Sequence, residues 1–193
     1  MKVPARFVTS ASKPEEFPLP GLPEVAVVGR SNVGTSSLIN KLVGHDSLAR
    51  TSRTPGRTRL VNWFEISGTF HMVDLPGYGY AAVSRETRES WRPLIEAYLA
   101  SRDCLAGVLL LIDIRRGIQE EELDFVPWLE ARKTPMIVAM TKCDKLPKNK
   151  RMLEITKARH ALKLRRDPYA VSAQSGDGIE ALWRAVRALT ERK

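Results

Sequence analysis

The stretch Val25-Ala-Val-Val-Gly29-Arg-Ser-Asn-Val-Gly34-Thr35-Ser36-Ser37-Leu38-Ile39-Asn40 decides the fold of this chain. A β-branched apolar run of buried-strand type ends at Gly29, and an apolar pattern of helical period begins at Leu38. The loop between them is bracketed by glycines and has the layout of the phosphate-binding motif G-x-x-x-x-G-K-[ST]. In that motif, backbone N–H groups surround phosphate oxygens, and the next helix directs its positive end at the same anion.

Thr35 stands where the motif has lysine, and it is the one departure from the pattern. Ser36 follows it, at the position where the motif places a hydroxyl on a Mg²⁺ ion that bridges the β- and γ-phosphates. The simpler interpretations are an ordinary early-helix serine and a chance strand, turn and helix. We favour a phosphate site because later motifs follow in the right order; its residues are Gly29, Arg30, Ser31, Asn32, Val33, Gly34, Thr35 and Ser36.

The composition is that of an ordinary soluble protein. The chain has 193 residues, 43% hydrophobic and 27% charged, which is enough for one domain with its own core. Cys104 and Cys143 lie far apart with no histidine at zinc spacing, so we expect reduced thiols in a cytoplasmic protein. The longest apolar run is too short to span a bilayer, and residues 1–6 lack the apolar region of a signal peptide, so no membrane is expected. The net charge of +9 favours a polyanionic partner, although it could serve solubility alone.

The order of apolar patterns predicts an α/β protein. Residues 1–24 are rich in proline and are predicted to form an extended arm with one short strand at 6–9, whereas 25–193 form the nucleotide-binding domain. Residues 44–59 lack periodicity and are predicted to be a long loop. A hairpin at 60–66 and 69–74 is followed by a helix from about 84 to 100, with a kink expected at Pro93. Strands at 105–113, 136–140 and 168–171 then alternate with helices at 119–131, 148–164 and 179–192, which predicts a mostly parallel six-stranded sheet with one antiparallel strand and helices on both faces.

Asp74-Leu75-Pro76-Gly77 matches D-x-x-G at the carboxyl end of a predicted strand, where doubly wound folds bind their ligands. The aspartate can reach a Mg²⁺ ion through water, and the Gly77 N–H can contact a γ-phosphate. Any strand can end in such a turn, so the motif gains its weight from its position directly after the hairpin.

Thr141-Lys142-Cys143-Asp144 follows the apolar strand 136–140 and matches the guanine signature [NT]-K-x-D. A carboxylate accepts hydrogen bonds from N1–H and the exocyclic amine of guanine, whereas adenine would leave it unpaired. The lysine stem packs on the ring. Ser172-Ala173-Gln174 follows the last strand. Loops of the form S-A-x at this position offer a backbone N–H to guanine O6. A strand-end turn of mixed charge is the simpler alternative.

The order of these motifs resembles the translation-factor-related GTPases. Gly29 to Gly34, together with Arg53-Thr-Pro-Gly-Arg-Thr58 and Asp74-Leu-Pro-Gly-Tyr-Gly-Tyr80, resembles the EngB family of bacterial ribosome-biogenesis GTP-binding proteins, also called YihA or YsxC, over nearly the whole chain. The resemblance implies a Ras-like G domain of the P-loop NTPase fold that binds GTP or GDP with Mg²⁺. It also implies a role in assembly of the large ribosomal subunit, with a link to cell division and septation.

The resemblance assigns further site residues. Thr58 would be the switch I threonine that closes on Mg²⁺ and the γ-phosphate, so the expected metal ligands are Ser36 and Thr58, and the expected nucleotide-contacting loop is Gly56, Arg57, Thr58, Arg59 and Leu60. Switch II would include Asp74, Gly77 and Tyr78. Tyr78 stands where fast-switching relatives carry a glutamine that orients the attacking water, so no catalytic residue is assigned and slow hydrolysis is expected. Asn32 resembles the asparagine through which some related GTPases bind K⁺.

The segment 141–169 contains ten Lys or Arg and three Asp or Glu, which contribute +7 to the net charge. We expect its basic side chains and those of the 44–59 loop to contact ribosomal RNA of the large-subunit particle, in a monomeric protein. These residues are Lys148, Lys150, Arg151, Lys157, Arg159, Lys163, Arg165 and Arg166, with Arg50, Arg53, Arg57 and Arg59. A solvated basic face is the alternative. The rival function is a nucleotide-silent RNA-binding module on the same scaffold, whereas Lys142 and Asp144 argue against an ATP-using kinase.

Overall fold

Strand β2 (Glu24–Gly29) lies at the centre of the sheet, and all six of its residues are buried. The computed structural model describes residues 2–49, 60–78 and 85–191, of which 85–92 are described by their backbone alone. It places β2 between β4 (Phe70–Asp74) and β5 (Leu105–Asp113), both of which are parallel to it. An apolar run without polar alternation is what a strand covered by helices on both faces requires.

Among the described residues the sheet has seven strands, in the order β1-β3-β4-β2-β5-β6-β7. Strand β3 (Val61–Ile66) is antiparallel to β4 and to β1 (Ala5–Ala11), whereas β6 (Met136–Thr141) and β7 (Tyr169–Ala170) continue the parallel part. The α/β class and the single antiparallel strand are confirmed. The predicted count of six is corrected to seven, because β1 from the predicted arm pairs along the edge of β3. The boundary between arm and domain at residues 24 and 25 stays a prediction.

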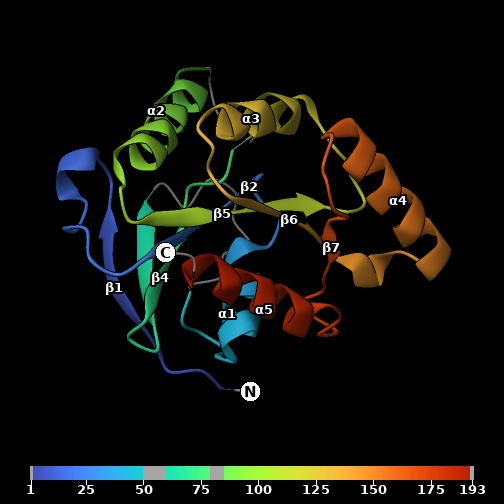
Figure 1. The fold of residues 1–193 in the computed structure, drawn as a ribbon, viewed down its shortest axis with the longest axis horizontal. Coiled ribbons are helices and arrows are strands. Elements are labelled where there is room, and N and C mark those ends of the chain that lie inside the picture. Colours follow the sequence, from blue (N-terminus) through green and yellow to red (C-terminus); the bar gives the residue numbers. More distant parts are fainter. Residues whose placement is uncertain (1, 50–59, 79–84, 192–193) are drawn as a thin grey trace.

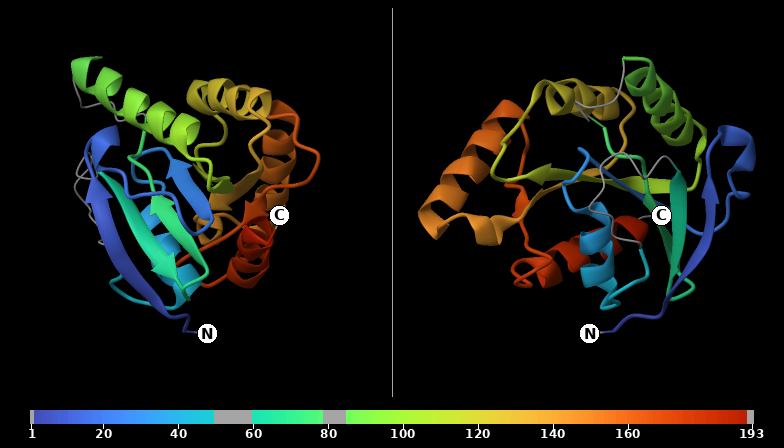
Figure 2. Two further views of the ribbon diagram at one scale, coloured as in Figure 1. Left: turned by 60° about the vertical axis from the view of Figure 1, so that its left-hand side comes forward. Right: turned by 180° about the vertical axis from the view of Figure 1, so that it is seen from behind.

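Helices cover both faces of the sheet (Figure 1). On one face, α1 (Thr35–Val43) and α5 (Ile179–Thr190) share a buried cluster with Val25 and Val27 of β2. On the other, α2 (Arg85–Ser101) and α3 (Glu120–Ala131) share a cluster with Ala26 and Val28. Successive β2 residues therefore point to opposite helical layers, as the strand period of two requires. The two views of Figure 2 show the same layering.

Helix α4 (Lys148–Ala161) lies beside the β6–β7 end of the sheet (Figures 1 and 2). Its inner side chains Ile155 and Ala158 are buried with Met140 and Ile114. The helix ends three residues before the predicted end at 164, and Lys163 then adopts a left-handed backbone with φ of 51°. None of the described helices is long and apolar enough to cross a bilayer.

The hairpin and α2 largely follow their predictions. The turn between β3 and β4 places Ser67 and Gly68 at positive φ, 51° and 66°, as a tight hairpin requires. Helix α2 contains Pro93, where the kink stays a prediction, and the predicted start at residue 84 lies outside the described residues. Two short 3-10 turns, Pro14–Glu16 and Cys143–Lys145, complete the described elements.

Candidate nucleotide-binding site

The P-loop runs from the end of β2 to the start of α1 in a conformation that its glycines make possible. A Cβ at Gly29 would lie 2.7 Å from the Leu111 carbonyl oxygen, so only glycine fits between the two strands. Asn32 and Gly34 adopt left-handed backbones, with φ of 66° and 100°, and α1 begins directly afterwards at Thr35. A loop with left-handed residues at alternate positions turns successive N–H groups towards one side and can hold an anion. This backbone conformation suits an anion, and the phosphate site itself stays a prediction.

Ser36 and Asp74 bring two oxygen donors together beside the P-loop. The Ser36 hydroxyl donates to Asp74 Oδ2 at 3.4 Å, and Asp74 is 4% exposed. Burial raises the pKa of this carboxyl to about 7, and the Ser36 hydrogen bond only partly opposes the rise. A hydroxyl and a carboxylate are ligands that suit Mg²⁺, which would bring positive charge to bridging phosphates. The other expected ligand, Thr58, lies outside the described residues, as do Gly56, Arg57 and Arg59.

The D-x-x-G segment lies against the P-loop. The Ser31 N–H donates to the Tyr78 carbonyl at 2.8 Å, and the Tyr78 N–H donates to the Gly29 carbonyl at 3.2 Å. A Cβ at Gly77 would be 3.0 Å from the Ser31 backbone, so a larger residue would separate the two segments. Leu75 is buried and continues the pairing by donating to Val27. Switch II therefore begins in direct contact with the phosphate loop, with Pro76 in the connecting turn.

The Tyr78 side chain points to α3. It is 4% exposed, and its hydroxyl donates to Glu122 Oε1 at 2.7 Å. The second oxygen of Glu122 accepts the Gln119 N–H at 2.8 Å and so caps the amino end of α3. Burial raises the pKa of Glu122, which leaves it well suited to share a hydrogen bond with the phenol. A tyrosine held in this way does not replace a water-orienting glutamine.

Two side chains of the guanine motif contact the P-loop. Lys142 Nζ donates to the Asn32 carbonyl at 2.6 Å, and Thr141 Oγ1 donates to the Val33 carbonyl at 2.9 Å. Lys142 itself has a left-handed backbone, φ 60°, which ends β6 and turns the chain. Cys143 is buried, and its N–H donates to the Val171 carbonyl. The two motifs, more than 100 residues apart in sequence, form one continuous wall.

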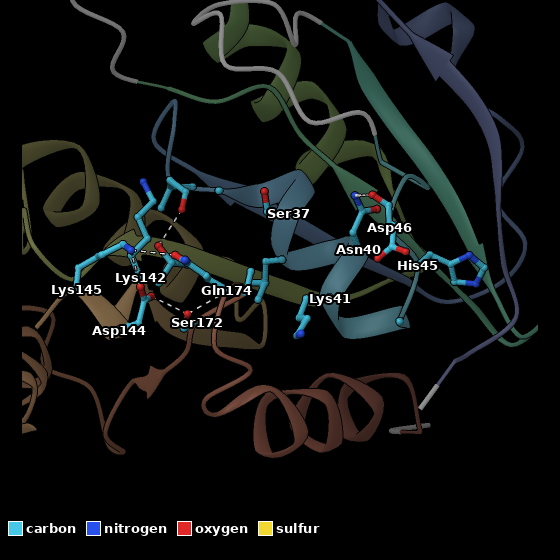
Figure 3. Close-up of a pocket in the computed structure, with 16 residues that line it drawn as sticks. Ser37, Asn40, Lys41, His45, Asp46, Lys142, Asp144, Lys145, Ser172 and Gln174 are labelled. Atoms are coloured by element: carbon cyan, nitrogen blue, oxygen red, sulfur yellow. Dashed lines mark hydrogen bonds and ion pairs between the residues drawn. The ribbon is translucent and has the colours of Figure 1, made fainter.

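Asp144, the predicted guanine-reading carboxylate, is oriented from both sides (Figure 3). Ser172 Oγ donates to Asp144 Oδ1 at 2.6 Å, and Lys145 Nζ lies 2.9 Å from Oδ2. These contacts lower the pKa of Asp144, with the Ser172 hydrogen bond as the larger cause. Ser172 Oγ also accepts the N–H groups of Gln174 and Ser175, which wraps the S-A-x loop around it. The loop and the carboxylate are thus positioned as a unit.

A cavity of about 740 Å³ opens between these motifs and α1 (Figure 3). Its volume is in the range of cofactor pockets. Eight predicted residues line it, namely Val33, Gly34, Thr141, Lys142, Asp144, Ser172, Ala173 and Gln174. Eight further lining residues were not predicted from the sequence, namely Ser37, Leu38, Asn40, Lys41, Gly44, His45, Asp46 and Lys145. The helical spacing of Ser37 and Lys41 on α1 was a usable signal, because residues four apart share a face. Leu60, also predicted, lies at the start of β3 and is 39% exposed.

Asn40 holds the chain that leaves α1. It is 5% exposed, and its amide exchanges two hydrogen bonds with the Ala49 backbone, at 2.9 Å to the carbonyl and 2.7 Å from the N–H. A short amide satisfies both groups at once, since it is donor and acceptor. In the sequence, the polar Asn40 within the apolar pattern of α1 was the one indication of this structural role. Asn40 thereby fixes the last described residue before position 50.

Two cations at the P-loop, Arg30 within it and Lys142 in contact with it, already have partners among the described residues. Arg30 lies 3.5 Å from Glu121 of α3, and Lys142 is bound to Asn32 as described above. Lys41 lines the far part of the cavity, near Gly176. The charge that the motif lysine would bring to the phosphates is therefore not replaced by Arg30 or Lys142 in this arrangement.

Comparison with known proteins agrees with this geometry. Residues 24–142 match the family model described as 50S ribosome-binding GTPase. The chain is 48% identical over 186 residues to a probable GTP-binding protein EngB of Geobacter sulfurreducens, covering 96% of this chain and 90% of that protein. It is 49% identical over 189 residues to the probable EngB of Pelobacter propionicus, covering 97% and 94%.

Solved structures share the fold. A crystal structure of a probable GTP-binding protein engB superposes with a TM-score of 0.74 at 24% identity, covering 88% of this chain and all (100%) of that one. Aquifex aeolicus Era bound to GDP and aluminium fluoride superposes with a TM-score of 0.71 at 22% identity, covering 89% of this chain and 58% of that one. With its P-loop, guanine motif and relatives in agreement, the chain belongs to the EngB family of GTP-binding proteins.

Proposed function

We propose that this protein is a Mg²⁺-dependent GTP-binding switch that acts in assembly of the large ribosomal subunit. The observation that carries the proposal is the oriented carboxylate of Asp144, which lines the same cavity as Val33 and Gly34 of the P-loop. In this proposal bound Mg²⁺–GTP orders the 44–59 and 77–84 segments, of which 50–59 and 79–84 lie outside the described residues, so that they dock on the ribosomal particle, and hydrolysis or nucleotide loss releases them. The description of the family model, 50S ribosome-binding GTPase, supports the choice of partner.

Hydrolysis by the protein alone should be slow. Tyr78 is committed to Glu122, so switch II begins without a side chain that could orient water. Thr35 removes a charge that would favour the transferring phosphoryl group. In this proposal the ribosomal particle acts as activator. The Tyr78→Gln variant should hydrolyse GTP faster than the parent in isolation, and an unchanged rate would count against this account.

The RNA-contacting surface in this proposal is the exposed side of α4 and the turn after it. Among the described residues there, Arg151, Lys157 and Arg159 pair with Asp177, Glu154 and Asp167. Five other cations are exposed and form no ion pair within the described chain, namely Lys148, Lys150, Lys163, Arg165 and Arg166. Unpaired cations contribute most to phosphate binding, because they have no internal partner to give up.

A salt titration tests this surface. Each neutralised phosphate adds about 0.7–0.9 to the slope of log affinity against log salt concentration. Glutamate substitutions at Lys150, Lys163 and Arg166 should flatten the slope for 50S particles or rRNA. The matched comparison is between two single variants, Lys163→Glu and Lys157→Glu, and the slope should change less for Lys157→Glu because Lys157 already pairs with Glu154 at 2.7 Å. A slope that stays constant in the triple variant places the contact on another face.

The rival is a nucleotide-silent module that binds RNA on a GTPase scaffold. Fluorescent GDP and GTP titrated with and without Mg²⁺, followed by 50S binding in each state, separate the two functions. We expect guanine nucleotides to bind and GTP to strengthen 50S binding. Equal 50S binding in all nucleotide states would favour the rival.

The remaining parts of the proposal rest on the family resemblance. They are a link to cell division and septation, a cytoplasmic location and a monomeric state. K⁺ binding through Asn32 is a further part, since Asn32 lies in the P-loop at φ 66°. Equal nucleotide turnover in Na⁺ and K⁺ buffers would remove the K⁺ site from the proposal.

A further inference from the structure

Asp113 lies outside the sequence motifs but in direct contact with one of them, the guanine motif. It ends β5 and pairs in register with Thr141, the first residue of the guanine motif. The residue is 7% exposed. Its Oδ2 accepts a hydrogen bond from Lys142 Nζ at 3.0 Å, and Arg115 donates to both carboxylate oxygens, at 2.9 Å to Oδ1 and 2.6 Å to Oδ2. A buried carboxylate with two cationic partners stays charged and holds both.

The contact restricts a side chain that would otherwise be mobile. Lysine has a long flexible stem, and an exposed ammonium gains little from any single position. Here Lys142 Nζ is held between Asp113 and the Asn32 carbonyl, at 3.0 and 2.6 Å. The stem between these contacts and the backbone passes the P-loop, because a Cβ at Gly34 would lie 3.9 Å from Lys142 Cε. That stem is the part expected to pack on the guanine ring.

We propose that Asp113 is a positioning residue for guanine-nucleotide binding, which fixes the Lys142 ammonium so that the lysine stem forms a preorganised surface for the base. The inference rests on the proposed GTP-binding function and deepens it. Preorganisation raises affinity because the free protein has already lost the side-chain freedom that binding would otherwise remove. Asp113 itself lines a smaller cavity of about 80 Å³ and not the nucleotide cavity, so it acts through Lys142.

The ionised state of Asp113 supports this role. Burial favours the neutral carboxyl, but hydrogen bonds from Arg115 and Lys142 outweigh it and lower the pKa to about 2. The carboxylate is therefore charged throughout the physiological range. An amide of the same shape in its place would accept one hydrogen bond without charge and would present its NH₂ group to a cation, so Lys142 would keep only the Asn32 carbonyl as a strong partner.

The first test is Asp113→Asn, with GDP and GTP affinities measured by fluorescent-nucleotide titration. Both affinities should fall about tenfold, the size expected for loss of a charge-assisted contact, and by the same factor within about twofold. The losses should match because the base is common to both nucleotides. Arg115 and Lys142 are 46% and 30% exposed, so both can reach water in the variant and the fold should be retained. An unchanged affinity, or a loss confined to GTP, would overturn the inference.

A double-mutant cycle with Lys142→Met separates positioning from a general structural effect. Methionine keeps an apolar stem and removes the ammonium that Asp113 holds. If Asp113 acts through that ammonium, Asp113→Asn should change the affinity less than about twofold in the Lys142→Met background, because coupled contacts are non-additive. A further tenfold loss in that background would show that Asp113 acts by another route and would overturn the inference.

Two controls complete the design. Asp167→Asn removes a carboxylate that pairs with Arg159 at 3.4 Å away from the cavity, and it should leave both affinities unchanged. A parent protein that binds neither nucleotide would overturn the proposed function and this inference together. If the parent binds both nucleotides and the Asp113→Asn variant binds them with the same affinities, only the inference is overturned.

Discussion

Thr35→Lys is the most informative single substitution, because it completes the one motif that the chain leaves incomplete. Thr35 is the first residue of α1, directly after the left-handed Gly34. A lysine here would extend its ammonium over the P-loop towards the β- and γ-phosphate oxygens. Threonine is too short to reach and carries no charge.

The size of the effect follows from which cations are already committed. Arg30 is paired with Glu121 at 3.5 Å, and Lys142 with Asn32 and Asp113, so neither competes for the position that the new ammonium would take. The new contact should therefore contribute the full value of a charge-assisted hydrogen bond, about 1.5–3 kcal/mol. Since each 1.4 kcal/mol is a factor of ten, GTP affinity should rise by about one to two powers of ten.

Isothermal titration of GTP and GDP with Mg²⁺, and single-turnover hydrolysis, are the assays. GDP affinity should rise less than GTP affinity, because the γ-phosphate depends most on the added cation. Thr35→Met adds length without charge and is the matched control, which should leave both affinities near the parent values. If GTP affinity and hydrolysis in the lysine variant both stay within about twofold of the parent, the missing charge is irrelevant and the reasoning fails.

Three further predictions concern groups whose surroundings are described. Asp144→Asn should shift selectivity from guanine to xanthine nucleotides, because xanthine presents a carbonyl where guanine has its amine; unchanged GDP and XDP affinities would mean that the base is read elsewhere. The folded-state pKa of Asp74 is about 7 against an ordinary value of 3.8, so the folded protein holds an extra proton between these values. Without Mg²⁺, Asp74 should therefore make a contribution to the free energy of unfolding that falls as pH rises from about 4 to 7. Urea denaturation of the parent and of Asp74→Asn across this pH range should show that the variant lacks this fall. Asn40→Leu should lower the free energy of unfolding by about 1–3 kcal/mol for each Ala49 backbone group left without its partner, and a smaller change would show that water replaces the amide.

The central layers of the fold could be predicted because each element carries its own signal. The run 25–28 is apolar at every position, which marks a strand covered on both faces, and β2 is buried throughout. Helix α3 begins where Gln119 and Glu122 form a capping box, next to its predicted start. Such patterns are local, so tertiary contacts only reinforce them.

The short strand predicted at 6–9 is confirmed within β1, but its full length and its place at the edge of the sheet could not be predicted in the same way. Strand β1 pairs with a segment at least 50 residues away, and its register shifts between Phe7 and Thr9, which interrupts the alternation along the strand. The hydrogen-bond partners of Glu24 could not be predicted from the sequence either. Glu24 is 1% exposed, and its hydrogen bonds come from Trp63, Tyr98 and Arg102, residues that only the fold brings together.

The site shows a related division between motif residues and their supports. Asp144 could be predicted because it belongs to the local motif T-K-x-D, and Ser172 because it opens an S-A-x loop directly after the last strand; the structure brings the two side chains within 2.6 Å. Asp113 and Asn40 are a strand-end aspartate and a helical asparagine, both common in sequences. Their roles depend on Lys142, 29 residues away, and on Ala49, across a loop. Sequence spacing carries no information about such partners.

The two halves of the nucleotide site lead to different expectations for switching. The base half is preorganised, since Lys142 and Asp144 each have two partners in place. The phosphate half lacks the motif lysine and, in the proposed function, would depend on the loop N–H groups, on Mg²⁺ at Ser36 and on Gly77. Because the base is common to GDP and GTP, its contacts raise both affinities alike and cannot by themselves make the GTP-bound conformation differ from the GDP-bound one; contacts to the γ-phosphate can. The chain should therefore bind guanine nucleotides while separating GTP from GDP weakly, and Thr35→Lys should widen that separation without altering selectivity for the base.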